Sequence, residues 1–163
     1  MSTRRRRHKR QGGQRGIAAV EFALVFGLLL VLLYGIATFG AALYIQQAVS
    51  RAAEDGARAA PLLPSLMLKG NQAAAVEQIK GAVRDSLAGS LIVPAAGNIT
   101  PATRRSWIAS HVTGTVVTAS PLVTVTVSYP YSLNRVLPSV PLFDASRWMP
   151  NTLTSRATAV LYS

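Results

Sequence analysis

A long uncharged run near the N-terminus limits what this chain can fold into. The positions from Phe22 to Leu43 are 22 consecutive residues without a charged side chain. At about 1.5 Å per residue, a helix of that length covers roughly 33 Å, enough to cross the hydrocarbon core of a bilayer. The run therefore predicts a membrane-spanning helix. It is too long for the apolar region of a secretory signal peptide, about 7–15 residues, which excludes a secreted protein cut near residues 57–59.

The basic residues are concentrated ahead of this run. The 16 residues up to Gly16 hold seven Arg or Lys and no Asp or Glu, whereas the rest of the chain holds ten basic and six acidic residues. The net charge of +11 is therefore mostly a property of the N-terminal tail. Positive charge stays on the cytoplasmic side of a membrane, so the tail predicts a cytoplasmic N-terminus. We prefer this interpretation to a patch that binds nucleic-acid phosphates and to a merely solvated tail.

A single acidic residue lies at the edge of the run. Four residues separate Gly16 from Glu21, and Phe22 follows directly. A carboxylate costs about 2.5–3.5 kcal/mol at the centre of a bilayer and less near the interface, and acidic residues in spans are functional by default. Cleavage between Gly16 and Ile17 would make Glu21 the fifth residue, one helical turn from the new amine. The structural alternative is a Glu21 side chain that only reaches back to the cytoplasmic interface.

The spacing of apolar residues and of proline predicts three helices. The first is expected over residues 17–60, because no proline interrupts it before Pro61. A second is expected over residues 72–88, with Asn71 as the N-cap and Gly89 at its end. A short third helix is expected to begin at Thr100-Pro101 and to carry Trp107 and Ile108.

Three later segments alternate apolar and polar residues and predict strands, namely 111–119, 122–131 and 153–162. We expect an α+β fold in which the long N-terminal helix precedes a small domain with a helix and a three- or four-stranded antiparallel sheet. The expected organisation is a basic leader (1–16), the long helix (17–60, with the span at about 22–43), a linker (61–69) and an extracytoplasmic domain (70–163).

Small residues recur at intervals of four along the first helix. Ala19, Ala23 and Gly27 fall on one face, and the pairs Ala37/Ala41 and Ala48/Ala52 repeat the spacing. Small residues at this spacing let neighbouring helix backbones approach closely, which predicts a helix-packing face. A helix rich in alanine also produces such spacings by chance, so both interpretations remain open.

The segment Arg15-Gly16-Ile17-Ala18-Ala19-Val20-Glu21-Phe22, with the apolar helix after it, resembles the TadE-like proteins, pseudopilins of tight-adherence (Flp-type) pilus systems. A looser likeness lies in residues 123–129 and the terminal strand. The resemblance implies cleavage by a prepilin peptidase, with Gly16 as the last leader residue and Ile17 as the first mature one. It also implies that Glu21, followed by the aromatic Phe22, pairs with the N-terminal amine of a neighbouring subunit.

The resemblance further implies a single-pass protein of the bacterial inner membrane with a cytoplasmic N-terminus and a periplasmic domain. Its partners would be the prepilin peptidase, other pilin-like subunits, the inner-membrane assembly platform and membrane lipid, with no nucleic acid. A domain of about 100 residues after the helix favours a minor subunit over the main pilus building block. The alternative is an unprocessed anchor whose periplasmic domain binds a partner in a secretion or pilus complex. Incorporation into an extracellular pilus is left open.

The sequence offers no support for catalysis or for a cofactor. There is no cysteine, and neither His8 nor His111 has a metal-ligand partner at a useful spacing. His111, Asp144 and Ser146 could form a triad on paper, but no nucleophile elbow or orienting motif accompanies them. We therefore expect a protein that is not an enzyme.

Overall fold

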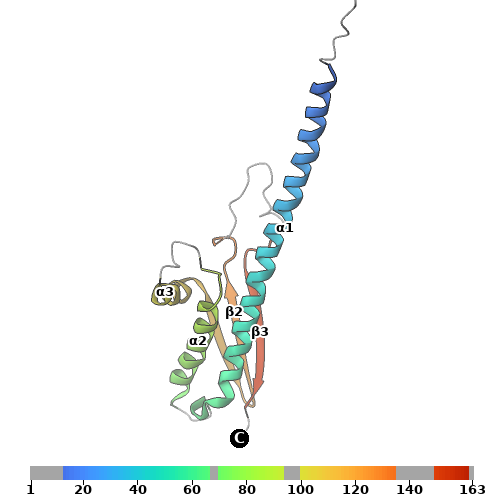
Figure 1. The fold of residues 1–163 in the computed structure, drawn as a ribbon. Helices are drawn as coiled ribbons and strands as arrows, with labels where there is room; N and C mark the ends of the chain where they lie inside the picture. The colour runs from blue at the N-terminus through green and yellow to red at the C-terminus, as the bar shows by residue number, and fades with distance from the viewer. Residues whose placement is uncertain (1–12, 67–69, 94–99, 135–148, 162–163) are drawn as a thin grey trace, which may run out of the picture. The chain divides into compact units, whose positions relative to one another are not determined.

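The first helix is longer at its N-terminus than the sequence predicts. The computed structural model describes residues 13–66, 70–93, 100–134 and 149–161, with side chains from residue 16 onward. Helix α1 (Gly13–Ala59) has 47 residues and includes the whole uncharged run (Figure 1). The expected start at Ile17 is wrong by one turn. The residues before it contain no proline, and two glycines cost only about 1 kcal/mol each in a helix.

The chain divides into two compact units, and the boundary between Ala37 and Thr38 falls inside α1. The second half of α1 therefore belongs to unit 2, the α+β unit, whereas the sequence interpretation had assigned all of the first helix to a separate segment. Helix α1 ends at Ala59, just before Pro61, and two 3-10 turns follow, η1 (Ala60–Leu62) and η2 (Pro64–Leu66). The prediction that proline ends this helix is confirmed.

Helix α2 (Gln72–Ala88) has the expected bounds and helix α3 (Pro101–His111) has the expected start, but only one of the two N-cap side chains makes a capping hydrogen bond. Asn71 is the N-cap residue of helix α2, as predicted, but its side chain makes no capping hydrogen bond. Helix α3 begins with a capping box. The Thr103 amide donates to Thr100 Oγ1 at 3.2 Å, and the Thr100 amide donates to Thr103 Oγ1 at 2.9 Å.

Three strands among the described residues form one antiparallel sheet with the order β1-β2-β3. They are β1 (Thr113–Ala119), β2 (Leu122–Tyr129) and β3 (Leu153–Val160). The predicted strand at 111–119 is wrong at its start, because α3 continues through His111. The predicted strand at 122–131 is too long at its end. Strand β2 stops at Tyr129, because Pro130 has no amide to donate to the ladder.

The register of the sheet divides it into a covered and an open face. Val123, Val125, Val127 and Tyr129 of β2 are fully buried on the covered face. The second half of α1 and helix α2 lie over that face (Figure 1), where they contribute Ile45, Val49, Ile79, Val83 and Leu87 to the core. The predicted α+β fold is confirmed.

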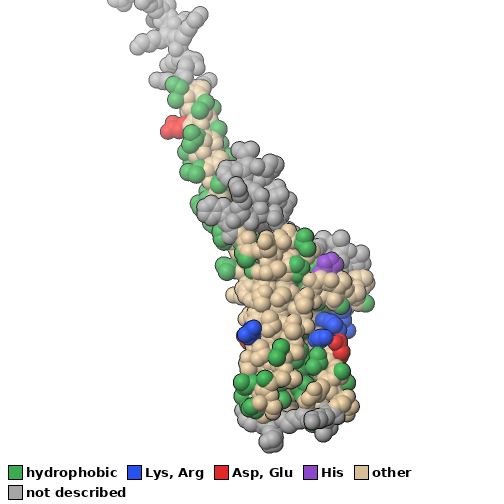
Figure 2. Space-filling model, turned by 180° about the vertical axis from the view of Figure 1, so that it is seen from behind, with side chains coloured by type: hydrophobic (Ala, Val, Ile, Leu, Met, Phe, Trp, Pro, Cys, Tyr) green, Lys and Arg blue, Asp and Glu red, His purple; other side chains and the backbone are tan. Residues whose placement is uncertain are grey.

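The open face of the sheet is rich in threonine. Cross-strand hydroxyl pairs join Thr124 to Thr158 at 3.3 Å and Ser128 to Thr154 at 3.1 Å. Seen from behind, unit 2 is mostly tan, the colour of hydroxyl side chains and backbone, with green side chains towards its lower end (Figure 2). This face therefore presents mainly hydroxyl groups, with the exposed Arg156 of β3 opposite Thr126.

Candidate functional site

The predicted motif lies on the first turns of α1 in unit 1. Glu21 and Phe22 are exposed, and Ile17 is 71% exposed one turn before Glu21. Residues four apart on a helix are neighbours on its surface, so the Glu21 carboxylate and the backbone of Ile17 share one side of the helix. The rings of Phe22 and Phe26 stack with centroids 5.7 Å apart and planes 12° apart. The motif is thus a carboxylate beside an aromatic pair at the start of the uncharged stretch of α1.

Gly16 is helical and has no packing role among the described residues. A Cβ built on it would meet nothing within 4 Å. Glycine in a helix interior is about 1 kcal/mol less favourable than alanine, and no close contact here compensates for that. Packing among the described residues therefore does not account for glycine at this position.

Glu21 has no cationic partner among the side chains that the structure describes. The ion pairs found there join Arg58 to Glu54, Lys80 and Arg84 to Glu77, and Arg105 to Asp85. All of them lie in unit 2. An exposed carboxylate at the start of an apolar helix is therefore available to a partner.

The apolar part of α1 satisfies the criteria for a membrane span. Within residues 16–62, an 18-residue window reaches a mean hydropathy of 2.6, and none of that window is buried inside the protein. The core helix of a soluble protein would instead be largely covered. The helix is compatible with a single-pass membrane anchor.

The small residues of α1 have two different surroundings. In unit 1, Ala19 and Ala23 are exposed and Gly27 has nothing within 4 Å of a built Cβ, so no helix of the described chain packs against them. In unit 2, Ala52 is fully buried and Ala48 packs against the same core. The pair Ala48/Ala52 therefore packs within the chain, whereas the first set and the pair Ala37/Ala41 stay predictions for packing between subunits.

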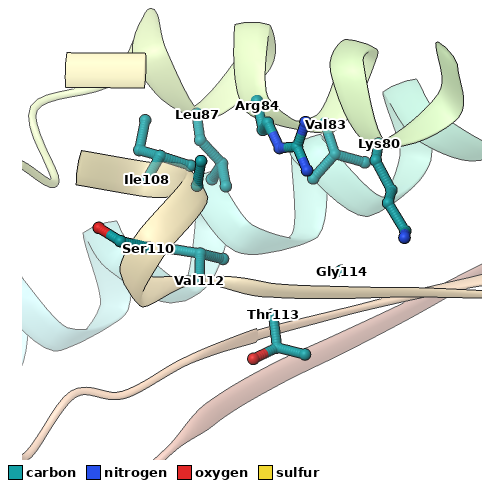
Figure 3. Close-up of a pocket in the computed structure, with 10 residues that line it drawn as sticks. Lys80, Val83, Arg84, Leu87, Ile108, Ser110, Val112, Thr113 and Gly114 are labelled. Carbon is teal, nitrogen blue, oxygen red and sulfur yellow. The ribbon is translucent and has the colours of Figure 1, made fainter. Parts of the chain in front are cut away.

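A cavity of about 260 Å³ lies between α2, α3 and β1 and was not predicted (Figure 3). Its apolar wall includes Val83, Leu87 and Ile108, and Gly114 of β1 forms part of the floor. A Cβ on Gly114 would meet nothing within 4 Å, so the missing side chain contributes to the space. No sequence signal distinguishes a strand glycine that leaves a cavity from one that permits a bulge.

The charged groups at this cavity are already paired. Lys80 Nζ donates to Glu77 Oε1 at 2.8 Å, and Arg84 Nη2 lies 3.7 Å from Glu77 Oε2. The hydrogen bond from Lys80 lowers the pKa of Glu77, and the charge of Arg84 adds to the effect. Two cations shared by one carboxylate give the cavity mouth a modest positive charge and no acid–base pair suited to catalysis.

Of the candidate triad, His111 alone belongs to the described residues. Asp144 and Ser146 lie outside the described residues, as does His8. The ring of His111 stacks on Trp107 with centroids 4.4 Å apart, and its Nδ1 lies 2.9 Å from the Trp107 carbonyl oxygen. Among the described residues, no group of three His, Cys, Asp or Glu side chains could hold a metal ion.

The family comparison agrees with the motif. The family model described as TadE-like protein matches residues 16–58, about a quarter of the chain, which confirms the predicted resemblance over those residues. The match suggests a protein associated with the Tad pilus. No curated protein and no solved structure matches the chain.

Proposed function

We propose that this chain is a pilin-like minor subunit, a pseudopilin, that a prepilin peptidase cleaves between Gly16 and Ile17 and that acts in assembly of a tight-adherence pilus. One observation carries the proposal. Glu21, a carboxylate with no cationic partner among the described side chains, lies shortly after Gly16 at the start of an exposed apolar helix of spanning length. The TadE-like match begins at the same glycine, which supports the proposed mature N-terminus.

The proposed chemistry of assembly follows from solvation. Cleavage would create an ammonium at Ile17, and a filament interior would remove it from water together with Glu21 of a neighbouring copy. An isolated charge in that setting carries a large desolvation penalty, whereas an ammonium and a carboxylate in contact offset it for each other. The role is therefore one of assembly and not of catalysis.

The orientation belongs to the same proposal. The basic leader would hold the N-terminus in the cytoplasm, and unit 2 would lie in the periplasm. We expect a reporter that works only outside the cytoplasm to be active when it is fused after Ser163. Activity of a reporter that works only in the cytoplasm would overturn the orientation.

A substitution at Gly16 tests the cleavage step. Gly16→Val should leave a full-length precursor in the membrane, because an extended backbone with a branched side chain cannot press flat into a peptidase cleft. Gly35→Val is the matched control, since Gly35 is also a helical glycine of α1 with nothing within 4 Å of a built Cβ. Both variants are expressed with the peptidase and sized on gels. Normal maturation of Gly16→Val would contradict the proposal.

The second candidate is an unprocessed single-pass anchor whose periplasmic domain binds a partner of a pilus or secretion complex. The observation that favours it is the helical state of Gly16. Helix α1 begins at Gly13, so a peptidase must unwind at least one turn before it can cleave. A precursor that persists in cells containing the peptidase, with wild-type Gly16, would favour this candidate.

A further inference from the structure

The end of unit 2 at which β2 ends carries exposed apolar side chains on three separate segments. These are Phe39, Leu43 and Tyr44 of α1, Leu91 after α2, and Leu133 after β2, together called the apolar rim below. Leu91 is 70% exposed and Leu133 is 81% exposed. The segments 38–44, 90–93 and 129–134 contain no charged residue. Soluble surfaces rarely gather large apolar side chains in this way without a partner.

Hydrogen bonds fix the three segments of the apolar rim to one another. The Leu91 amide donates to Tyr44 Oη at 3.0 Å, which ties the segment after α2 to α1. The buried Tyr129 hydroxyl lies 3.1 Å from the Ile92 carbonyl oxygen and 3.2 Å from that of Asn134. Both loops are therefore held at the same level as Tyr44. Figure 1 shows α2 and β2 ending at this same end of unit 2, whereas α1 ends at the opposite one.

We propose that the apolar rim is a second membrane contact, in which Leu91 and Leu133 enter the lipid interface beside the point where α1 leaves the bilayer. The proposal rests on α1 spanning the membrane, as in the proposed function. The argument for lipid is continuity. Leu43 is the last residue of the expected span, and the next residue, Tyr44, makes the hydrogen bond to Leu91. If Leu43 reaches the interface, the hydrogen bond from the Leu91 amide to Tyr44 Oη holds the segment after α2 beside the part of α1 that leaves the bilayer.

The composition of the apolar rim suits the interface rather than the hydrocarbon core. Tyr44 combines an apolar ring with a hydroxyl that has a partner, which is the character of residues enriched at membrane interfaces. Leu91 and Leu133 are on loops whose backbone groups need water or protein partners, so these loops could not enter the centre of the bilayer. Shallow insertion of the side chains alone meets both requirements. The rim would hold the domain against the membrane surface until the subunit leaves the bilayer.

Depth-dependent fluorescence quenching tests the proposal on the full chain. The sequence has no cysteine, so single substitutions can each carry one nitrobenzoxadiazole label. Leu91→Cys and Leu133→Cys are compared with Leu62→Cys and Leu122→Cys, which replace leucines 79% and 44% exposed. Leu62 lies in η1, directly after α1 and some 20 residues from Leu43, roughly 30 Å from the rim at the rise of a helix. Leu122 lies at the other end of β2, roughly 23 Å from Tyr129. Leu30→Cys marks the span.

The labelled proteins are reconstituted in phosphatidylethanolamine and phosphatidylglycerol vesicles that carry nitroxide lipids. We expect shallow nitroxides to quench the labels at 91 and 133 several-fold more than those at 62 and 122, with a blue shift of emission. Quenching of the label at position 30 without quenching of the labels at 91 and 133 would overturn the membrane contact of the apolar rim, while the membrane-spanning helix would still be supported. If the label at position 30 is not quenched either, the proposal that α1 anchors the protein in the membrane is contradicted. A blue shift at 91 and 133 without quenching would assign the rim to a protein neighbour and overturn lipid as its partner.

Discussion

Gly56 of α1 approaches Val83 of α2 so closely that a Cβ built on Gly56 would lie 2.6 Å from Val83 Cγ2. The same Cβ would lie 3.1 Å from Val125 Cγ1 of β2. Glycine at this position therefore lets α1 settle onto both the neighbouring helix and the sheet. Because Gly56 has no side chain, the helix layer and the sheet of unit 2 can pack closely at this point.

A methyl group at this position should destabilise unit 2. Gly56→Ala gains helix propensity but must displace Val83, and overpacking a core costs about 1–3 kcal/mol. Gly81→Ala is the control, because a Cβ on this glycine of α2 would meet nothing within 4 Å. We expect Gly81→Ala to be neutral or stabilising by up to about 1 kcal/mol. Urea unfolding in detergent, followed by circular dichroism, measures both. Equal effects would show that the close contact does not matter.

The two candidate N-caps should differ sharply. Thr100→Ala removes a capping box and should cost about 1 kcal/mol of stability. Asn71→Ala should change stability by only a few tenths of a kcal/mol, because the Asn71 side chain makes no capping hydrogen bond. Thermal unfolding of the two variants side by side checks this. A larger loss for Asn71→Ala than for Thr100→Ala would contradict the observed caps.

Tyr129 should make the fold sensitive to high pH. Burial raises the pKa of Tyr129 from its ordinary value of 10.0 to about 12, with a smaller contribution from Tyr131. The folded protein therefore holds this proton more tightly than the unfolded chain. Its stabilising effect is fully present below pH 10 and is lost as the pH rises through about 12.

Tyr129→Phe is the test of that dependence. The variant loses the hydroxyl contacts to Ile92 and Asn134 and should be less stable at pH 7, by about 1–3 kcal/mol for a buried hydrogen bond. Its stability should also fall less steeply between pH 10 and 12 than that of the wild type. Denaturant unfolding at a series of pH values measures both effects. Parallel curves for the two proteins would exclude Tyr129 as the titrating group.

Sequence patterns predicted elements well where local chemistry decides them. Pro61 ends α1 and Thr100-Pro101 starts α3, because proline fixes the backbone angle and the threonine hydroxyl satisfies a free amide. His111 was predicted to open a strand, yet its ring stacks on Trp107 one turn earlier and the residue stays in the helix, a local contact that the alternating pattern hides. Long-range contacts decide the rest. The need for glycine at position 56 comes from contacts with Val83 and Val125, which are distant in the sequence.

The candidate site divides in the same way. The glycine, glutamate and phenylalanine of the motif lie within seven residues of the sequence, so their spacing alone places them on one stretch of α1. The apolar rim could not be predicted, because Leu91 and Leu133 come together only through the contacts of Tyr44 and Tyr129. An isolated leucine in a loop carries no signal of its exposure.

Glu21 should separate processing from assembly. Glu21→Ala should still insert and still be cut at Gly16, because the peptidase mainly needs the leader and the glycine. Its recovery with pilin-like partners should collapse, since breaking one side of a buried ion pair typically costs about 3–5 kcal/mol. Glu21→Gln should rescue little, because an amide cannot neutralise an ammonium. Co-purification of the processed proteins measures this. Equal recovery of wild type and both variants would make Glu21 a passive interfacial residue.

The N-terminal residue of the protein isolated from membranes of its native host tests the central claim most directly. Intact mass and N-terminal sequencing identify it without any substitution. Cleavage after Gly16 predicts a chain that is 16 residues shorter than the translated one and begins with Ile17. A chain that retains the basic leader and begins at Met1 or Ser2 would contradict the claim.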